Sequence, residues 1–289
     1  VDITGLIAMS IKITKRLERF IYTKERERTL EYFCFIADSS IRAIVNCSSM
    51  NIPTLSGIIR RRLLLNYCIA PEFVTPLLPK GFRPKLVRGY SIAGICLIRL
   101  EKVRPQGLPE FLGISSENSA HRFAVEWDDG HDSKEGVFVP RRDTDSRLNS
   151  LAGGRIFPGV HHLSRFEVED QQDLVEMVVR DGKDSPLIDL EVHPANELPD
   201  TSIFSSLAES SDFFEAGCIG YSARPDSCVL DGLLLKVPDW KASALSVPKI
   251  RSRYFDNLEL FPAGSITFDH AILMRDIPHE WHSEPQIQT

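Results

Sequence analysis

Two neighbouring stretches decide the fold: GISSENSAHRFAVEW at residues 113–127 and GVFVPRRDTDSRLN at residues 136–149. Their short apolar and alternating runs predict strands at residues 119–127 and 137–141. Asp128-Asp129-Gly130 separates the two runs at the distance of a hairpin, so the strands are predicted to pair antiparallel.

Side chains alternate between the two faces of a strand. His121 and Arg122 are therefore expected to point in opposite directions, and so are His161 and His162. At most one member of each pair can line a given cavity.

The chain from residue 58 onward has the same character, with short β-rich runs punctuated by Gly, Pro and Asp. Further strands are predicted at residues 58–70, 90–103, 160–168, 174–180, 187–192, 213–221, 228–237 and 264–274. Short helices are predicted at residues 71–78, which begin with proline, and 143–151, which begin with capping residues. These patterns indicate a mainly β fold, a β-rich α+β chain with a few short helices.

The composition is that of a globular protein: 43% of the 289 residues are hydrophobic and 26% are charged. A net charge of -6 gives no reason to expect a nucleic-acid partner. No run approaches the roughly 18 to 20 consecutive apolar residues of a membrane-spanning helix, and the N-terminus lacks the order of a secretory signal. We expect a cytoplasmic protein without a membrane partner.

The six cysteines are scattered, without zinc-ligand spacing, which predicts buried thiols in a reducing compartment. The nucleophile elbow, the phosphate loop, the dinucleotide fingerprint and the His-Glu-x-x-His helix are all absent from the sequence. His279-Glu280-Trp281-His282 comes nearest to the last of these but has the wrong spacing. Neither a metal nor a cofactor is predicted.

Composition changes near residue 50, because all 18 prolines follow Met50 and residues 10–36 read as a charged helix. Residues 1–49 are predicted to be a partly helical N-terminal extension, and residues 50–289 the folded domain. Three interpretations of the extension stay open: a helix that packs or binds a partner, a loosely attached segment, or a misassigned upstream reading frame with Met50 as the true start.

Polar and charged side chains crowd residues 113–162, within segments that otherwise read as strands. Buried ionised groups are costly unless they are paired. The cluster is either a functional site or an ion-pair network, in which residues 141–147 hold a strand-to-helix junction and Glu117 pairs with an arginine.

Several of these motifs resemble the acetoacetate decarboxylase-like superfamily, and most closely an uncharacterised bacterial branch, a domain of unknown function. The matching pieces are NYCIAPEFVTPLLPKGF (66–82), GISSENSAHR (113–122), GVFVPRRDTDSRLN (136–149), GGRIFPGVHH (153–162) and, more weakly, GCIGYS (217–222) and FPAGSITFDHAILMR (261–275). The resemblance spans about three quarters of the chain. It implies a closed, cone-shaped antiparallel β-barrel with a small-molecule cavity inside.

In the superfamily's decarboxylase a lysine forms a Schiff base with the keto acid, beside a second lysine that lowers its pKa. The lysine pair falls on Gly153 and Gly154 of this sequence. Arg155 cannot replace the nucleophile, because a guanidinium stays protonated. The resemblance therefore implies a branch that lacks the Schiff-base lysine.

Two further family positions carry over. The acidic loop residue matches Glu117, whereas a second glutamate, expected near Ile92 or Ala93, has no counterpart. The carboxylate-binding arginine falls on Arg60, although the adjacent arginines at 61 and 62 leave the register open.

The leading hypothesis is a barrel that binds, and in its stronger form transforms, a small anionic carbonyl or carboxylate compound, by lyase-like chemistry without a lysine imine. The candidate catalytic residues are Glu117, His121, His161 and His162, and the candidate substrate-binding residues are Arg60, Arg122, Arg141 and Arg155. The competing hypothesis is a non-catalytic binding or structural barrel whose polar cluster is an ion-pair network. The expected partner is a small organic anion, and a homo-oligomer is allowed.

Overall fold

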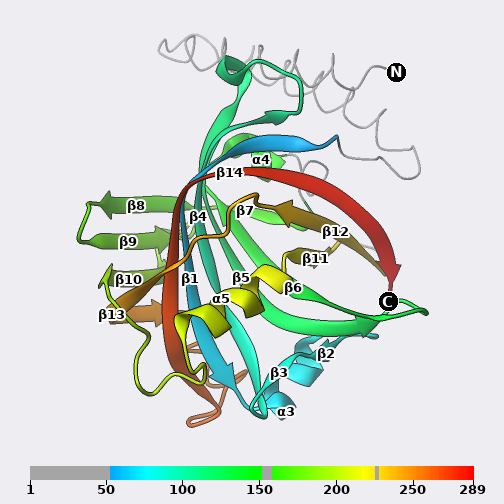
Figure 1. Cartoon of the computed structure of the whole chain (residues 1–289), viewed down its shortest axis with the longest axis vertical. Coiled ribbons are helices and arrows are strands. Elements are labelled where there is room, and N and C mark those ends of the chain that lie inside the picture. The colour runs from blue at the N-terminus through cyan, green and yellow to red at the C-terminus, as the bar shows by residue number, and fades with distance from the viewer. Residues whose placement is uncertain (1–52, 152–157, 225–227) are drawn as a thin grey trace.

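The computed structural model describes residues 53–151, 158–224 and 228–289. Their strands join into one continuous sheet, accompanied by a few short helices (Figure 1). The predicted mainly β fold is confirmed. The predictions for residues 1–49 fall outside the described residues.

The elements have the following bounds. The strands are β1 (Leu55–Ile69), β2 (Arg83–Pro84), β3 (Leu86–Val87), β4 (Tyr90–Pro105), β5 (Ile114–Asp128), β6 (Ser133–Thr144), β7 (His161–Leu163), β8 (Arg165–Asp170), β9 (Val175–Arg180), β10 (Pro186–Pro194), β11 (Ile219–Ala223), β12 (Val229–Lys236), β13 (Ser243–Ser252) and β14 (Ile266–Gln288). The helices are α3 (Pro71–Val74), α4 (Arg147–Leu151) and α5 (Leu207–Ala216), with short 3-10 turns at η1 (Thr75–Leu77) and η2 (Glu110–Leu112).

Seven strands form a closed ring in the order β1-β4-β5-β6-β11-β12-β14. The 23 residues of β14 close it, because this long strand pairs with β1 along its first part and with β12 along its last. Neighbours in the ring are antiparallel except β6 and β11, which run parallel. The hairpin predicted at residues 128–130 is present, since β5 pairs antiparallel with β6 on either side of that turn.

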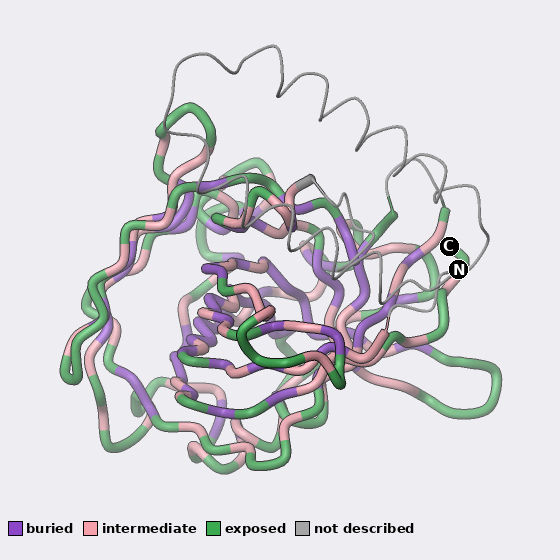
Figure 2. The backbone as a smooth tube through the Cα atoms, turned by 90° about the horizontal axis from the view of Figure 1, so that it is seen from above, coloured by how far each residue is buried: buried purple, intermediate pink, exposed green. Residues whose placement is uncertain are grey.

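The strands β13, β10, β9 and β8 extend the sheet from β14 and pack against the ring (Figure 1). One apolar cluster joins the two parts, with Leu65 and Phe123 from the ring and Met177 and Leu190 from the extension, all at most 2% exposed. Burying such a side chain contributes about 1.5–3 kcal/mol. Figure 2 shows the buried residues gathered along the strands and the exposed ones at the connections.

The segment predicted as a strand at residues 213–221 is helix α5 followed by β11, so that prediction is wrong over most of its length. The Oγ atom of Ser206 accepts a hydrogen bond from the backbone N–H of Glu209 at 3.1 Å and caps the helix. This Ser-x-x-Glu pattern begins a helix, and the apolar run after it only resembles a strand. The predictions also miss β13. The single strand predicted at residues 160–168 is two strands in the structure, β7 and β8.

The four described cysteines, Cys68, Cys96, Cys218 and Cys228, are free thiols. Three of them are half-buried and Cys228 is exposed, so the prediction of buried thiols is wrong for Cys228. Among the described residues, no helix has the length and apolar character needed to cross a membrane.

Candidate functional site

Strand β5 carries three of the eight predicted site residues, Glu117, His121 and Arg122, and presents them on two faces. Glu117 and His121 lie on the face of Phe123, toward the apolar cluster that joins ring and extension. Arg122 lies on the opposite face and lines a cavity. The predicted opposition of His121 and Arg122 is confirmed, and it separates the candidate acid–base groups from this candidate anion-binding group.

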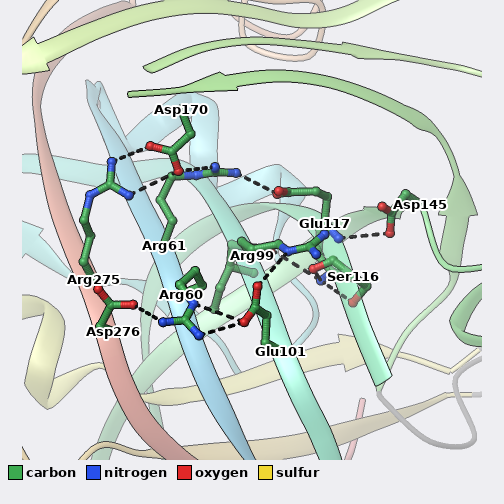
Figure 3. A network of polar contacts seen from close by, with 12 residues as sticks. Arg60, Arg61, Arg99, Glu101, Ser116, Glu117, Asp145, Asp170, Arg275 and Asp276 are labelled. Atoms are coloured by element: carbon green, nitrogen blue, oxygen red, sulfur yellow. Dashed lines mark hydrogen bonds and ion pairs between the residues drawn. The ribbon is translucent and has the colours of Figure 1, made fainter. Parts of the chain in front are cut away.

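Glu117 is part of a buried ion-pair network on the core-facing side (Figure 3). Arg61, only 2% exposed, donates one hydrogen bond to Glu117 and another to Asp170, both at 2.7 Å. Arg275 also donates to Asp170, at 2.6 Å. Burial raises the pKa of Glu117, and Arg61 acts in the opposite direction. Glu117 therefore has the environment expected for a structural ion-pair partner.

Arg60 lies on the outer surface, where its side chain is 44% exposed and pairs with Glu101 at 2.8 Å and Asp276 at 2.6 Å. Burial alternates without a break along this part of β1, with Ile59, Arg61 and Leu63 buried and Arg60 exposed between them, so Arg61 points toward the core. The buried arginine is consequently Arg61, one position beyond the residue that the family resemblance selected.

Asp143 is fully buried, and both oxygens of its carboxylate accept hydrogen bonds from neighbouring side chains. Arg141 donates to both carboxylate oxygens, at 3.0 and 2.7 Å, and Ser164 and Ser119 donate at 3.0 and 3.3 Å. The predicted ion-pair network at this junction is therefore real for Arg141 and Asp143, and the guanidinium of Arg141 is already occupied.

His121 is 1% exposed and packs against the rings of Tyr254 and Phe255. Its Nε2 atom lies 3.3 Å from the Oγ atom of Ser252, while its Nδ1 atom is buried without a partner. Burial lowers the pKa of His121 to about 4, so the ring is neutral at neutral pH.

The other two histidine candidates differ in exposure. His161 is 8% exposed, and burial together with Arg142 lowers its pKa to about 4. His162 is exposed. Arg155 lies outside the described residues.

Every strand of the ring, together with α5, contributes to the wall of a cavity of about 80 Å3. Its apolar wall includes Phe213, Phe214, Leu233, Leu235 and Trp281. The charged residues that line it are Arg62, Lys85, Arg122 and Arg142, and none of the described lining residues is acidic. A water molecule needs about 10–15 Å3 by this measure, so the cavity has room for several water-sized groups.

The three arginines of the cavity come from different strands, Arg62 from β1, Arg122 from β5 and Arg142 from β6. None of them forms an ion pair with a carboxylate among the described residues, whereas the arginines of the core and surface networks do. The Nε atoms of Arg62 and Arg122 are buried without a partner. Burial lowers the pKa of Arg122 and of Arg142 to about 10, so both are charged at neutral pH.

A buried network holds Arg122 in place. Its guanidinium donates to the Oδ1 atom of Asn66 at 2.6 Å and stacks 4.6 Å from the ring centroid of Phe214. The Nδ2 atom of Asn66 lies 3.1 Å from Nε2 of His270, whose Nδ1 atom lies 2.5 Å from Asp269. Because a guanidinium only donates hydrogen bonds, the amide of Asn66 must present its oxygen to Arg122. The arginine is therefore oriented before any ligand arrives.

Ser210 completes an arrangement in the order of a catalytic triad, since its Oγ atom lies 2.7 Å from Nε2 of His270. Ser210 and His270 are both 0% exposed, and neither lines the cavity. Asp269 also accepts hydrogen bonds from Ser202 and from the backbone of Ile203. The arrangement joins α5 and its preceding loop to the ring, and no substrate can reach the serine.

Sequence reasoning missed Arg62, Arg142 and Lys85 as cavity residues. The hairpin register contained the signal for Arg142, because Arg142 pairs with Ala120 and so shares the face of Arg122. Lys85 has no such signal, since it lies between the two-residue strands β2 and β3. Its ammonium group lies 4.3 Å from the ring centroid of Phe213 and pairs with Glu135 at 2.5 Å.

Among the described residues, no group of three or more His, Cys, Asp or Glu side chains could hold a metal ion.

The sequence matches the profile of the DUF2071 family, described as an uncharacterized conserved protein, over residues 59–224. This span is more than half of the 289 residues. The chain belongs to the DUF2071 family. A comparison with curated proteins found no match.

Solved structures similar to this DUF2071 protein have the acetoacetate decarboxylase fold. An acetoacetate decarboxylase from Legionella pneumophila has a TM-score of 0.53 at 14% identity, over 83% of this chain and 92% of that one. An acetoacetate decarboxylase-like enzyme from Sphingomonas wittichii has a TM-score of 0.52 at 13% identity, over 83% and 94%. The resemblance seen in the sequence motifs is confirmed. Likeness at such identities establishes the fold alone, because one fold hosts many functions.

Proposed function

We propose that this DUF2071 protein binds a small organic anion, a carboxylate or carbonyl compound, in the cavity of the ring. The observation that carries the proposal is the set of three arginines, Arg62, Arg122 and Arg142, which line one cavity without a carboxylate partner among the described residues. An unpaired charge costs stability where it is buried, as at Arg122, and a ligand that supplies the counter-charge removes that cost.

The binding is non-covalent. Among the described residues, Lys85 is the lysine that lines the cavity, and its side-chain nitrogen is engaged by Glu135 at 2.5 Å. The family's lysine positions correspond to Gly153 and Gly154, which carry no amine.

A catalytic role for Glu117 and the histidines stays a separate prediction. Glu117 and His121 face away from the cavity, and Glu117 is held by Arg61. Binding without turnover is thus the form of the hypothesis that the geometry supports best. If Glu117 does act as an acid or base, Glu117→Gln should abolish turnover of a bound compound while leaving its affinity unchanged.

A thermal-shift and calorimetric screen of keto acids, hydroxy acids and related anions tests the binding. A ligand at about 100 times its Kd stabilises by about 2.7 kcal/mol, which corresponds to a rise of several degrees. Arg122→Gln and Arg142→Gln should lose that shift. Arg165→Gln, which removes a surface arginine 59% exposed on β8, is the matched control and should retain it. The proposal would be refuted if no compound raised the melting temperature, or if the rise were the same in both cavity variants as in the unaltered chain.

Borohydride treatment in the presence of acetoacetate or pyruvate tests the non-covalent part. The mass of the protein should stay unchanged, because no lysine of the cavity is free to form an imine. A stable adduct that maps to Lys85 would show that the lysine chemistry survives at a new position.

A further inference from the structure

The cavity carries more positive charge than one carboxylate can neutralise. Arg62, Arg122 and Arg142 contribute three guanidinium groups, and the charge of Lys85 is balanced by Glu135. None of the described lining residues is acidic. A bound monoanion would leave two of the three charges without a partner.

The three guanidinium groups differ in how many of their N–H groups already donate a hydrogen bond within the chain. Arg142 uses its Nε atom on Ser222 at 3.2 Å, and Arg122 uses one terminal nitrogen on Asn66 at 2.6 Å. Among the described residues, the polar contact of Arg62 is a long one of 3.8 Å with the sulfur of Met274, and its guanidinium lies 5.2 Å from the ring centroid of Trp240. Each arginine therefore keeps free N–H groups, and such groups bind carboxylate or phosphate oxygens in charge-assisted pairs.

The arginines are also anchored on separate strands. Arg62 lies on β1, Arg122 on β5 and Arg142 on β6, so the donors are distributed around the wall. The apolar side chains of Phe213, Phe214, Leu233 and Leu235 form other parts of the same wall and can contact a carbon skeleton.

We infer that the ligand is a small organic dianion, whose two negative charges are held by different arginines of the cavity while its carbon skeleton contacts the apolar wall. The inference rests on the proposed anion binding and narrows it to one class of compound. Dicarboxylates and phosphate monoesters share this chemistry.

Matched pairs of anions separate charge from size. Isothermal titration calorimetry at pH 7.5 and constant ionic strength would compare succinate with butyrate, and 2-oxoglutarate with 2-oxopentanoate. Dihydroxyacetone phosphate forms a separate arm that distinguishes phosphate esters from dicarboxylates. The dianion of at least one class should bind at least about tenfold more tightly than the monoanions. Constant ionic strength matters because screening weakens charge pairs.

The cavity variants test whether the arginines bind the second negative charge of a dianion. In Arg142→Gln and in Arg62→Gln, the preference for the dianion should fall by about tenfold or more, whereas the affinity for the monoanion should change much less. Arg165→Gln should leave both affinities unchanged, because this arginine pairs with Glu167 and Asp184 on the surface.

Two results would overturn the inference in distinguishable ways. If monoanions and dianions bind equally well and both lose affinity in Arg122→Gln, the ligand class is wrong and the proposed anion binding stands. If no anion of either charge binds, or binding is indifferent to the cavity arginines, the proposed function fails and this inference fails with it.

Discussion

Removing Arg61 should destabilise the protein far more than removing Arg122, although both arginines are at least 96% buried in the same ring. Arg61 donates to Glu117 and Asp170 at 2.7 Å each. In Arg61→Met, the carboxylate of Glu117, 8% exposed, loses this counter-charge. Breaking a buried ion pair from one side costs about 3–5 kcal/mol.

Arg122 has no carboxylate partner among the described residues, so its removal leaves no buried carboxylate unpaired. Burial lowers its pKa from 12.5 to about 10, which corresponds to about 3 kcal/mol against the charged form in the folded state. In the opposite direction, its hydrogen bond to Asn66 contributes about 1.5–3 kcal/mol, and its contact with Phe214 contributes about 0.5–2 kcal/mol. The favourable contributions together come to about 2–5 kcal/mol against about 3, so Arg122→Met should lower the free energy of unfolding by no more than about 2 kcal/mol.

Urea unfolding followed by the fluorescence of the three tryptophans measures both variants. Arg165→Met is the exposed control and should behave as the unaltered chain. Arg61→Met should also recover stability as the pH falls, because the unpaired Glu117 has a raised pKa in the folded state and takes up a proton there first. Equal losses in Arg61→Met and Arg122→Met would refute the division between a paired core network and unpaired cavity arginines.

Three further predictions concern single positions. The pKa of His121 falls to about 4 on folding, so the unfolded chain takes up the proton first and the folded state loses stability between pH 6.5 and about 4. Urea unfolding measures the free energy of unfolding at pH 7 and at pH 4.5, and its decrease between the two should be about 2–3 kcal/mol smaller in His121→Gln. The same decrease in the variant and the unaltered chain would contradict the assignment. Asn66→Asp places a carboxylate beside Arg122 and should weaken anion binding by about tenfold or more in calorimetry, while equal affinity would show that Asn66 does not control the arginine. Gly136→Ala puts a methyl group 2.4 Å from the carbonyl oxygen of Ile219 and should cost about 1–3 kcal/mol in urea unfolding, whereas Gly182→Ala, with nothing within 4 Å, should cost little; equal costs would contradict the close approach of β6 and β11.

The sequence predicted the strands well wherever the pattern is local. The hairpin of β5 and β6 follows from the alternation of side chains and from the turn residues, and the structure contains this hairpin. Helix α5 was mistaken for a strand because its Phe213-Phe214 pair looks β-like, and only the cap at Ser206 reveals the helix. Closure of the ring depends on β1 meeting β14 about 200 residues later. The family resemblance implied a closed barrel without naming this pairing, and periodicity could not predict it.

The candidate site shows the same limit at the level of single residues. Alternation correctly separated His121 from Arg122, but the family resemblance selected Arg60, whereas Arg61 is the arginine that shares the buried face of Ile59 and Leu63. A shift of one residue in the alignment exchanges the two faces of a strand, and three adjacent arginines at 60, 61 and 62 do not fix that register. The neighbours that decide whether an arginine is paired also come from distant parts of the chain.

The contrast between the two faces of the ring is the strongest reason to look for a ligand. On the core-facing side, Arg61 and Arg141 have carboxylate partners within the chain. On the cavity side, Arg122 and Arg142 have none among the described residues, although burial penalises their charge. A chain selected for stability alone gains nothing from this difference, because an apolar side chain would fill the same space at lower cost. Places where a sequence breaks a stability rule without compensation mark function. The fold alone would not have revealed this, since structures that share it at 14% identity or less need not share the charges inside it.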